Sequence, residues 1–217
     1  FPTRRSSDLS AGVGSGFSHE DYKSAGATMA ESKEQLFQQA TLIVKVKEPL
    51  LSECRFFRPG QTLFTYLHLA VLPEVTKALL GTTITAIAYE TIEAKDGTRP
   101  MLKPMSEIAG RMSVQIGAHY LEKTQGGRGL LLAGVPGVEP GNVVVLGAGV
   151  VGSEATRIAV GMGAQVTVLN LDLERLRTLD ELYCGRIVTR ASTQAAIDES
   201  VMAADLVIGA VLVPGAR

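Results

Sequence analysis

Residues 143–152 read Val143-Val144-Val145-Leu146-Gly147-Ala148-Gly149-Val150-Val151-Gly152, and no other ten residues of the chain are as informative. A β-branched apolar run leads directly into glycines spaced as GxGxxG, which open a helix-like segment. In this context the first glycine permits a tight turn, the second lets backbone approach a pyrophosphate, and the third lets helix pack closely on strand. The helix N-terminus offers unpaired N–H groups to phosphates. We therefore predict a dinucleotide-binding unit; the alternative is a glycine turn that serves packing alone.

Strand-like and helix-like segments alternate on both sides of this unit. Downstream, the predicted strands are 143–146, 165–169, 186–189 and 206–210, and the predicted helices are 150–162, 173–182 and 193–203. Upstream, the predicted strands are 42–46, 62–67 and 83–88, and the predicted helices are 31–40, 73–80 and 106–123, the last capped by Ser106. Such alternation is typical of α/β domains whose parallel sheets are covered by helices on both faces. We place a first domain at residues 10–104 and a second at 105–217.

In a dinucleotide-binding unit the second strand normally ends in an acidic residue that hydrogen-bonds the adenosine ribose. Here Asn170 follows that strand. Its amide can bind a ribose hydroxyl, but it lacks the charge that repels a 2′-phosphate. Asp172 stands two residues further on and either takes the acidic role or caps the helix predicted over 173–182.

Composition excludes several classes of function. The net charge is −1, aromatic residues make up 5% and Trp is absent, so neither nucleic-acid binding nor an anionic membrane surface is favoured. No apolar run reaches the roughly 18 residues of a membrane span. The two cysteines, Cys54 and Cys184, lack metal-binding spacing, so we expect reduced, partly buried thiols in a reducing compartment and no metal site.

The first nine residues do not fit this pattern. They lack an initiator Met and any apolar period, and we interpret residues 1–9 as a non-native remnant of translated adapter sequence. A short native polar arm is the alternative.

Several longer strings resemble the alanine dehydrogenase family, and the resemblance runs from about Ala11 to Arg217. The strings are Leu42–Pro49 (LIVKVKEP), Leu63–Ala70 (LFTYLHLA), Pro104–Met112 (PMSEIAGRM), Thr124–Gly129 (TQGGRG), Gly134–Val138 (GVPGV) and Ala204–Leu212 (ADLVIGAVL). The resemblance implies two Rossmann-like domains with parallel sheets, both incomplete in this chain, because the family extends beyond each end. It also implies that a substrate-binding arginine before Ala11 and a catalytic aspartate after Arg217 are missing, so we expect this chain alone to be inactive and poorly stable.

The resemblance assigns roles to individual residues. His68 matches the catalytic histidine; an imidazole at a strand end can exchange protons near neutral pH, although a lone histidine is more often a core residue. Lys47 matches a substrate contact, and its ammonium can pair with a carboxylate or polarise a carbonyl. Without the resemblance, we would interpret Lys47 as a solvated lysine at a strand end. His19 and His119 match no motif. The expected NAD contacts are Ser106, Gly147, Gly149, Val150, Val151, Gly152, Asn170, Arg175, Ser192, Val211 and Leu212.

Two of these positions depart from the family pattern. The family places an acid where Asn170 stands and commonly a lysine where Arg175 stands, which leaves the strength of the preference for NAD over NADP open. The implied activity is reversible, NAD-dependent oxidative deamination of L-alanine to pyruvate and ammonium, by a cytoplasmic homohexamer. The alternatives are the NAD-binding subunit of a proton-translocating transhydrogenase, against which His68 and Lys47 argue, and a nucleotide-binding module without catalysis.

Overall fold

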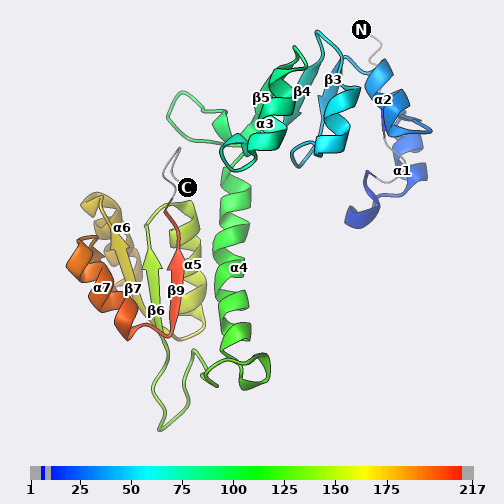
Figure 1. Cartoon of the computed structure of the whole chain (residues 1–217). Helices are drawn as coiled ribbons and strands as arrows, with labels where there is room; N and C mark the ends of the chain where they lie inside the picture. The colour runs from blue at the N-terminus through cyan, green and yellow to red at the C-terminus, as the bar shows by residue number, and fades with distance from the viewer. Residues whose placement is uncertain (1–5, 8–10, 212–217) are drawn as a thin grey trace. The chain divides into compact units, whose positions relative to one another are not determined.

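The chain divides between Arg99 and Pro100 into two compact α/β units (Figure 1). The computed structural model describes residues 6–7 and 11–211. Each unit contains a sheet of parallel strands, so the predicted fold class is confirmed. No helix in the described part of the chain is long and apolar enough to cross a membrane.

The second unit is built on a four-stranded parallel sheet with the order β8-β7-β6-β9. Its strands are β6 (Asn142–Leu146), β7 (Gln165–Asn170), β8 (Ile187–Ala191) and β9 (Leu206–Gly209). The crossover helices are α5 (Val150–Gly161), α6 (Leu173–Tyr183) and α7 (Gln194–Ala203), and α4 (Lys103–Leu121) precedes them. The chain runs outward from β6 through β7 to β8 and then returns, so that β9 pairs with the edge of β6 opposite β7. Figure 1 shows β6 between β7 and β9. The strand order therefore switches between β6 and β9, where open α/β sheets bind their ligands.

Strand β6 lies at the centre of the unit because helices cover both of its faces. Val143 and Val145 are fully buried in the cluster that includes residues of α4, α5 and α6. Val144 points to the opposite face, where it packs with Ala196 of α7. A strand buried on both sides has no polar face, which explains the continuous valine run.

Close backbone packing fixes α5 against β6 and α4 against α5. A Cβ on Gly152 would lie 1.8 Å from the carbonyl oxygen of Gly147, at the end of β6. A Cβ on Gly110 of α4 would lie 2.3 Å from the carbonyl oxygen of Val151. Real Cβ atoms cannot approach that closely, so both positions require glycine in this arrangement.

The first unit contains a three-stranded parallel sheet of order β3-β4-β5. Its strands are β3 (Leu42–Val44), β4 (Thr62–Thr65) and β5 (Thr85–Ala88). Ile43 and Leu63 form a core with side chains of α2 (Lys33–Gln39), α3 (Pro73–Leu80) and the 3₁₀ helix η2 (Leu51–Phe56). Upstream lie α1 (His19–Ser24) and a small parallel pair, β1 (Ser6–Ser7) and β2 (Thr28–Met29).

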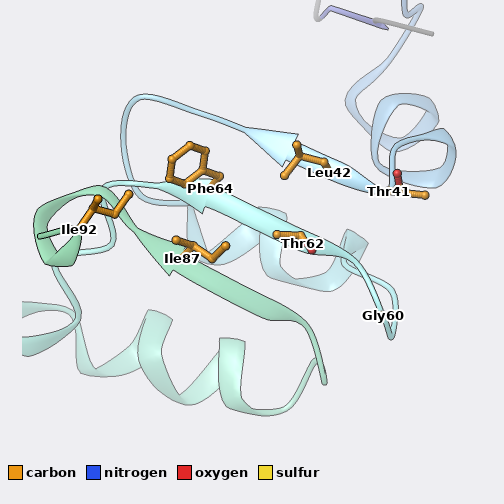
Figure 2. A pocket seen from close by; sticks show the side chains of 7 residues that line it. All are labelled: Thr41, Leu42, Gly60, Thr62, Phe64, Ile87 and Ile92. Carbon is orange, nitrogen blue, oxygen red and sulfur yellow. The ribbon is translucent and has the colours of Figure 1, made fainter. Parts of the chain in front are cut away.

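The opposite face of this sheet carries apolar side chains that stay open to solvent. Leu42, Val44 and Ile87 are 52%, 60% and 42% exposed. Together with Phe64 and Ile92, Leu42 and Ile87 line an open hollow of about 620 Å³ (Figure 2). Helices were expected on both faces of each sheet. They cover both faces in the second unit, whereas the described residues of the first unit cover only one face of its sheet.

Several predicted bounds differ from the structure: the strands predicted over 42–46 and 62–67 end at Val44 and Thr65, and the helix predicted over 31–40 spans Lys33–Gln39. Three further local expectations were wrong for identifiable reasons. Ser106 does not cap α4: the helix begins at Lys103, with Pro104 in its first turn, and the Ser106 N–H already donates to the Leu102 carbonyl (3.1 Å). Proline is well suited to a first turn because its missing N–H would be unpaired there. Cys184 is exposed rather than partly buried, since it ends α6 in the left-handed conformation (φ 50°), whereas Cys54 is buried. Strand β5 begins at Thr85 instead of Thr83 because Thr83 is itself left-handed (φ 53°).

The packing at Gly152 gives a stability prediction. We expect Gly152→Ala to destabilise the second unit by about 2 kcal/mol or more, because the new methyl group meets a backbone oxygen that cannot move aside. Gly161→Ala, in the same helix but with nothing within 4 Å of the added Cβ, should change stability by less than about 1 kcal/mol. Urea denaturation of both variants measures this. Equal stability of the two variants would show that the helix–strand contact is not tight.

Candidate functional site

The glycine turn after β6 is held between the ends of the neighbouring strands. Gly147 has φ 110°, which side chains rarely adopt, and a Cβ there would lie 2.6 Å from the Ala210 carbonyl oxygen. Its N–H donates to the carbonyl of Leu169 at the end of β7 (2.7 Å). Both the backbone conformation and the packing therefore require glycine at this position.

Gly149 differs from the other two glycines of the motif. Its φ of −76° is open to any residue, and the atom nearest to an added Cβ is Nη1 of Arg175, at 3.8 Å. Neither conformation nor packing calls for glycine, so the remaining reason is close approach of another molecule. Gly149 is also the N-cap of α5, and no side chain caps this helix start. Open space above unpaired helix amides suits a pyrophosphate, so these residues fit a dinucleotide.

Asn170, at the end of β7, binds the glycine turn and the next helix start. Its Oδ1 accepts the N–H of Ala148 (3.1 Å), and its Nδ2 donates to the carbonyl of Asp172 (3.0 Å). Asp172 is the N-cap of α6, where its Oδ1 accepts the N–H groups of Glu174 (3.0 Å) and Arg175 (3.4 Å). Of the two roles considered for Asp172, the structure therefore contains the helix cap.

Most of the remaining residues assigned to the nucleotide lie near the same edge of the sheet. Ser192 follows β8, and its N–H donates to the Asn170 carbonyl (3.0 Å). Val211 follows β9, and its Cγ2 lies 3.2 Å from the Cβ position of Gly147. Val150 and Val151 open α5, and Ser106 lies one turn before Gly110 on the same face of α4. Leu212 is outside the described residues.

A second group of polar side chains meets at the carboxyl ends of β3, β4 and β5. Nδ1 of His68, after β4, lies 2.9 Å from Oε2 of Glu48, after β3. The imidazole stacks on the Tyr66 ring, with 5.9 Å between centroids and 8° between planes. Hydrogen bonding from His68 holds the pKa of Glu48 below its ordinary value, and the backbone amide of Glu48 acts in the same direction. Glu48 is thus the anionic partner that orients the ring.

The backbone of His68 is held by a second carboxylate. His68 adopts a left-handed conformation (φ 48°, ψ 35°), which is uncommon for a residue with a side chain. Glu90, in the 3₁₀ helix η4 (Tyr89–Thr91) after β5, accepts the N–H groups of Leu67 (3.0 Å) and His68 (2.8 Å) through Oε1. Strain that neighbouring groups hold in place is characteristic of functional sites.

The two lysines of the string Lys45-Val46-Lys47 have different environments. Lys45 pairs with the buried carboxylate of Glu53, which also accepts from Lys33 (3.0 Å) and the Leu50 N–H (2.9 Å). Burial alone would raise the pKa of Glu53, but these hydrogen bonds and charges outweigh burial and lower it. Lys47 is exposed, while its carbonyl accepts from the buried hydroxyl of Thr65 (2.7 Å). Its backbone is thus fixed at the strand end, and its side chain is directed to solvent.

The sequence named His68 and Lys47 as candidate site residues but not the carboxylates beside His68. Glu48 stands within the same string as Lys47, and Glu90 follows the predicted strand 83–88 by two residues. Because the carboxyl ends of neighbouring parallel strands share one edge of a sheet, an acid after each strand was a usable signal. The hollow of Figure 2 is a different place, because none of Lys47, Glu48, His68 and Glu90 lines it and its lining residues carry no charge. Among the described residues, no group of His, Cys, Asp and Glu could hold a metal ion.

Family models match nearly the whole chain. The description "Alanine dehydrogenase/PNT, N-terminal domain" matches residues 8–109, and "Alanine dehydrogenase/PNT, C-terminal domain" matches residues 113–217. Alanine dehydrogenases of Methanococcus maripaludis and Halomonas elongata are 53% and 56% identical, each over 95% of this chain and 56% of its own length. The chain thus spans little more than half the length of these curated relatives.

Solved structures give the same assignment. An L-alanine dehydrogenase structure superposes with a TM-score of 0.88 at 50% identity, over 99% of this chain and 59% of that one. A transhydrogenase from Sinorhizobium meliloti superposes with a TM-score of 0.77 at 24% identity, over 99% of this chain and 62% of that one, which shows a shared fold. With both family models and relatives above 50% identity in agreement, the chain belongs to the alanine dehydrogenase/PNT family.

Proposed function

We propose that this chain forms part of an enzyme that oxidises L-alanine with NAD to pyruvate and ammonium, reversibly. The observation that carries the proposal is the His68–Glu48 pair, which stands with Lys47 at one sheet edge (2.9 Å between Nδ1 and Oε2). The relatives named alanine dehydrogenase support it. Cytoplasmic location and homohexameric assembly belong to the same proposal and follow the family resemblance.

NAD is proposed to bind at the glycine turn. The pyrophosphate would meet the amides that open α5, above Gly149, while Asn170, Arg175 and Ser192 would line the adenosine side. Ser106, Val211 and Leu212 complete the proposed set. Bound there, the cofactor would accept a hydride from Cα of alanine.

The chain's own residues would handle charge and protons. Lys47 would pair with the substrate carboxylate or polarise the carbonyl oxygen of pyruvate. After hydride loss the substrate is an imine; water adds to its carbon, and the resulting carbinolamine expels ammonia as the C–N bond breaks and C=O forms. Each of these steps moves a proton. Because Glu48 engages Nδ1 of His68, the ring would exchange protons with the substrate through Nε2. Glu90 holds the backbone of His68 in place by accepting its N–H.

The open space above Gly149 predicts a variant that loses binding without losing stability. We expect Gly149→Ala to weaken NADH binding by about tenfold or more, because a methyl group would occupy the approach to the helix amides. The melting temperature should stay near wild type, since nothing packs within 3.8 Å of the new Cβ. Fluorescence titration with NADH, alongside a thermal melt, measures both. Unchanged affinity would indicate that the glycine turn serves packing alone.

Alanine turnover tests the catalytic assignment. The assay uses a full-length protein built around this chain, with the remaining length supplied by an alanine dehydrogenase relative. We expect alanine-dependent NADH formation, and a fall in kcat of about 100-fold or more in His68→Ala, the usual scale of general acid–base catalysis. His119→Ala is the matched control, because His119 is an exposed histidine of α4 paired with Glu122. Similar turnover in both variants would remove His68 from the mechanism, and absent turnover in the parent protein would overturn the proposed function.

A further inference from the structure

The adenosine side of the nucleotide site lacks a free negative charge at the end of β7. The amide of Asn170 is engaged at both of its ends, by the Ala148 N–H and the Asp172 carbonyl. The amide oxygen Oδ1 accepts the Ala148 N–H of the glycine turn, as a carboxylate oxygen at this position could also do. It does so without the charge that would repel a phosphate on the 2′-oxygen of the ribose.

Asp172 is the nearest acid in sequence, and its charge is compensated locally. Oδ1 accepts two backbone N–H groups at the start of α6, and Oδ2 lies 3.5 Å from Nε of Arg175. The positive end of the α6 dipole is at the same place. The carboxylate of Asp172 is thus engaged by the start of α6 and by Arg175. In dinucleotide-binding units that discriminate against a 2′-phosphate, the acid after the second strand is instead available to the ribose.

Arg175 extends from Asp172 toward the glycine turn. Its Nε faces Asp172, and its Nη1 lies 3.8 Å from the Cβ position of Gly149. The side chain is 60% exposed, so its nitrogens are accessible to a phosphate. Other charges nearby are engaged elsewhere: Glu174 pairs with Arg177, and Arg190 pairs with Glu199 (2.6 Å). An accessible guanidinium beside an uncharged strand end is the arrangement that accommodates a 2′-phosphate.

We propose that this site accepts a 2′-phosphorylated nicotinamide dinucleotide, of the NADP class, as well as NAD, because Asn170 adds no repulsive charge and the exposed guanidinium of Arg175 offers N–H donors to a phosphate. The inference rests on the proposed function only in that the nucleotide binds at the glycine turn. A guanidinium this close to Gly149 could instead contact the pyrophosphate that both cofactors share, and the experiment separates these two phosphates.

The test compares NADH and NADPH affinities of the whole chain through the fluorescence of the nucleotides, which no Trp of the protein disturbs. We expect the dissociation constant for NADPH to lie within about tenfold of that for NADH, since one exposed charge pair changes affinity on this scale. Asn170→Asp should weaken NADPH binding by about tenfold or more relative to NADH binding, because only NADPH carries the 2′-phosphate that the new carboxylate repels. Arg175→Gln should weaken NADPH more than NADH, whereas Arg177→Gln, on the same helix, should affect neither.

Three results would overturn the inference. They are an NADPH affinity more than about 100-fold below that of NADH in the parent chain, equal losses for both nucleotides in Arg175→Gln, and no binding of either nucleotide. Asn170→Asp removes the donor to the Asp172 carbonyl, so melts accompany the titrations; if this variant does not fold, Arg175→Gln decides alone. Alanine turnover does not enter the assay. Missing turnover would therefore count against the proposed function, and an unfavourable NADPH ratio against this inference.

Discussion

The contact between Gly152 and the carbonyl of Gly147 sets the geometry of the nucleotide-binding unit. A Cβ added to Gly152 would lie only 1.8 Å from that oxygen, so α5 packs against the end of β6 at a distance that only a glycine allows. This distance fixes where the first amides of α5 stand, and the turn between strand and helix must then pass through the φ of 110° at Gly147. Gly149 is the one motif glycine that neither strain nor packing demands, and so it is the one that indicates a ligand.

Parallel sheets bring the chemistry of both units to strand ends. In the second unit the ends of β6, β7, β8 and β9 are joined by hydrogen bonds and contacts around Gly147 and Asn170. In the first unit the same rule brings Glu48, His68 and Glu90 together from three neighbouring strands. The two lysines after β3 have different roles. Half-buried Lys45 forms an ion pair with the buried carboxylate of Glu53, whereas Lys47, two residues further along the chain, is exposed.

Much of this arrangement could be predicted from sequence because the apolar periodicity and the glycine spacing are local signals. The helix over 73–80 and the order of strands and helices in the second unit are found as expected. Local signals failed where neighbours decided the outcome. Helix α4 begins at Lys103, with Pro104 in its first turn and ahead of Ser106, and Thr83 stays outside β5 because its backbone is left-handed. The carboxylates beside His68 were not predicted because their partners are 20 and 22 residues away, so only the sheet brings them together.

Amide hydrogen exchange of the chain, with and without NADH, would show where the nucleotide binds. If the glycine turn is the site, exchange slows at the amides that open α5 and in the segment from Asn170 to Arg175, because those groups face the bound phosphates and ribose. The amides of the buried residues Val143, Val144 and Val145 in β6 provide the internal reference, because we expect their exchange to be slow in either state. Unchanged exchange at the turn under saturating NADH, or protection confined to the apolar hollow over β3, β4 and β5, would contradict this account.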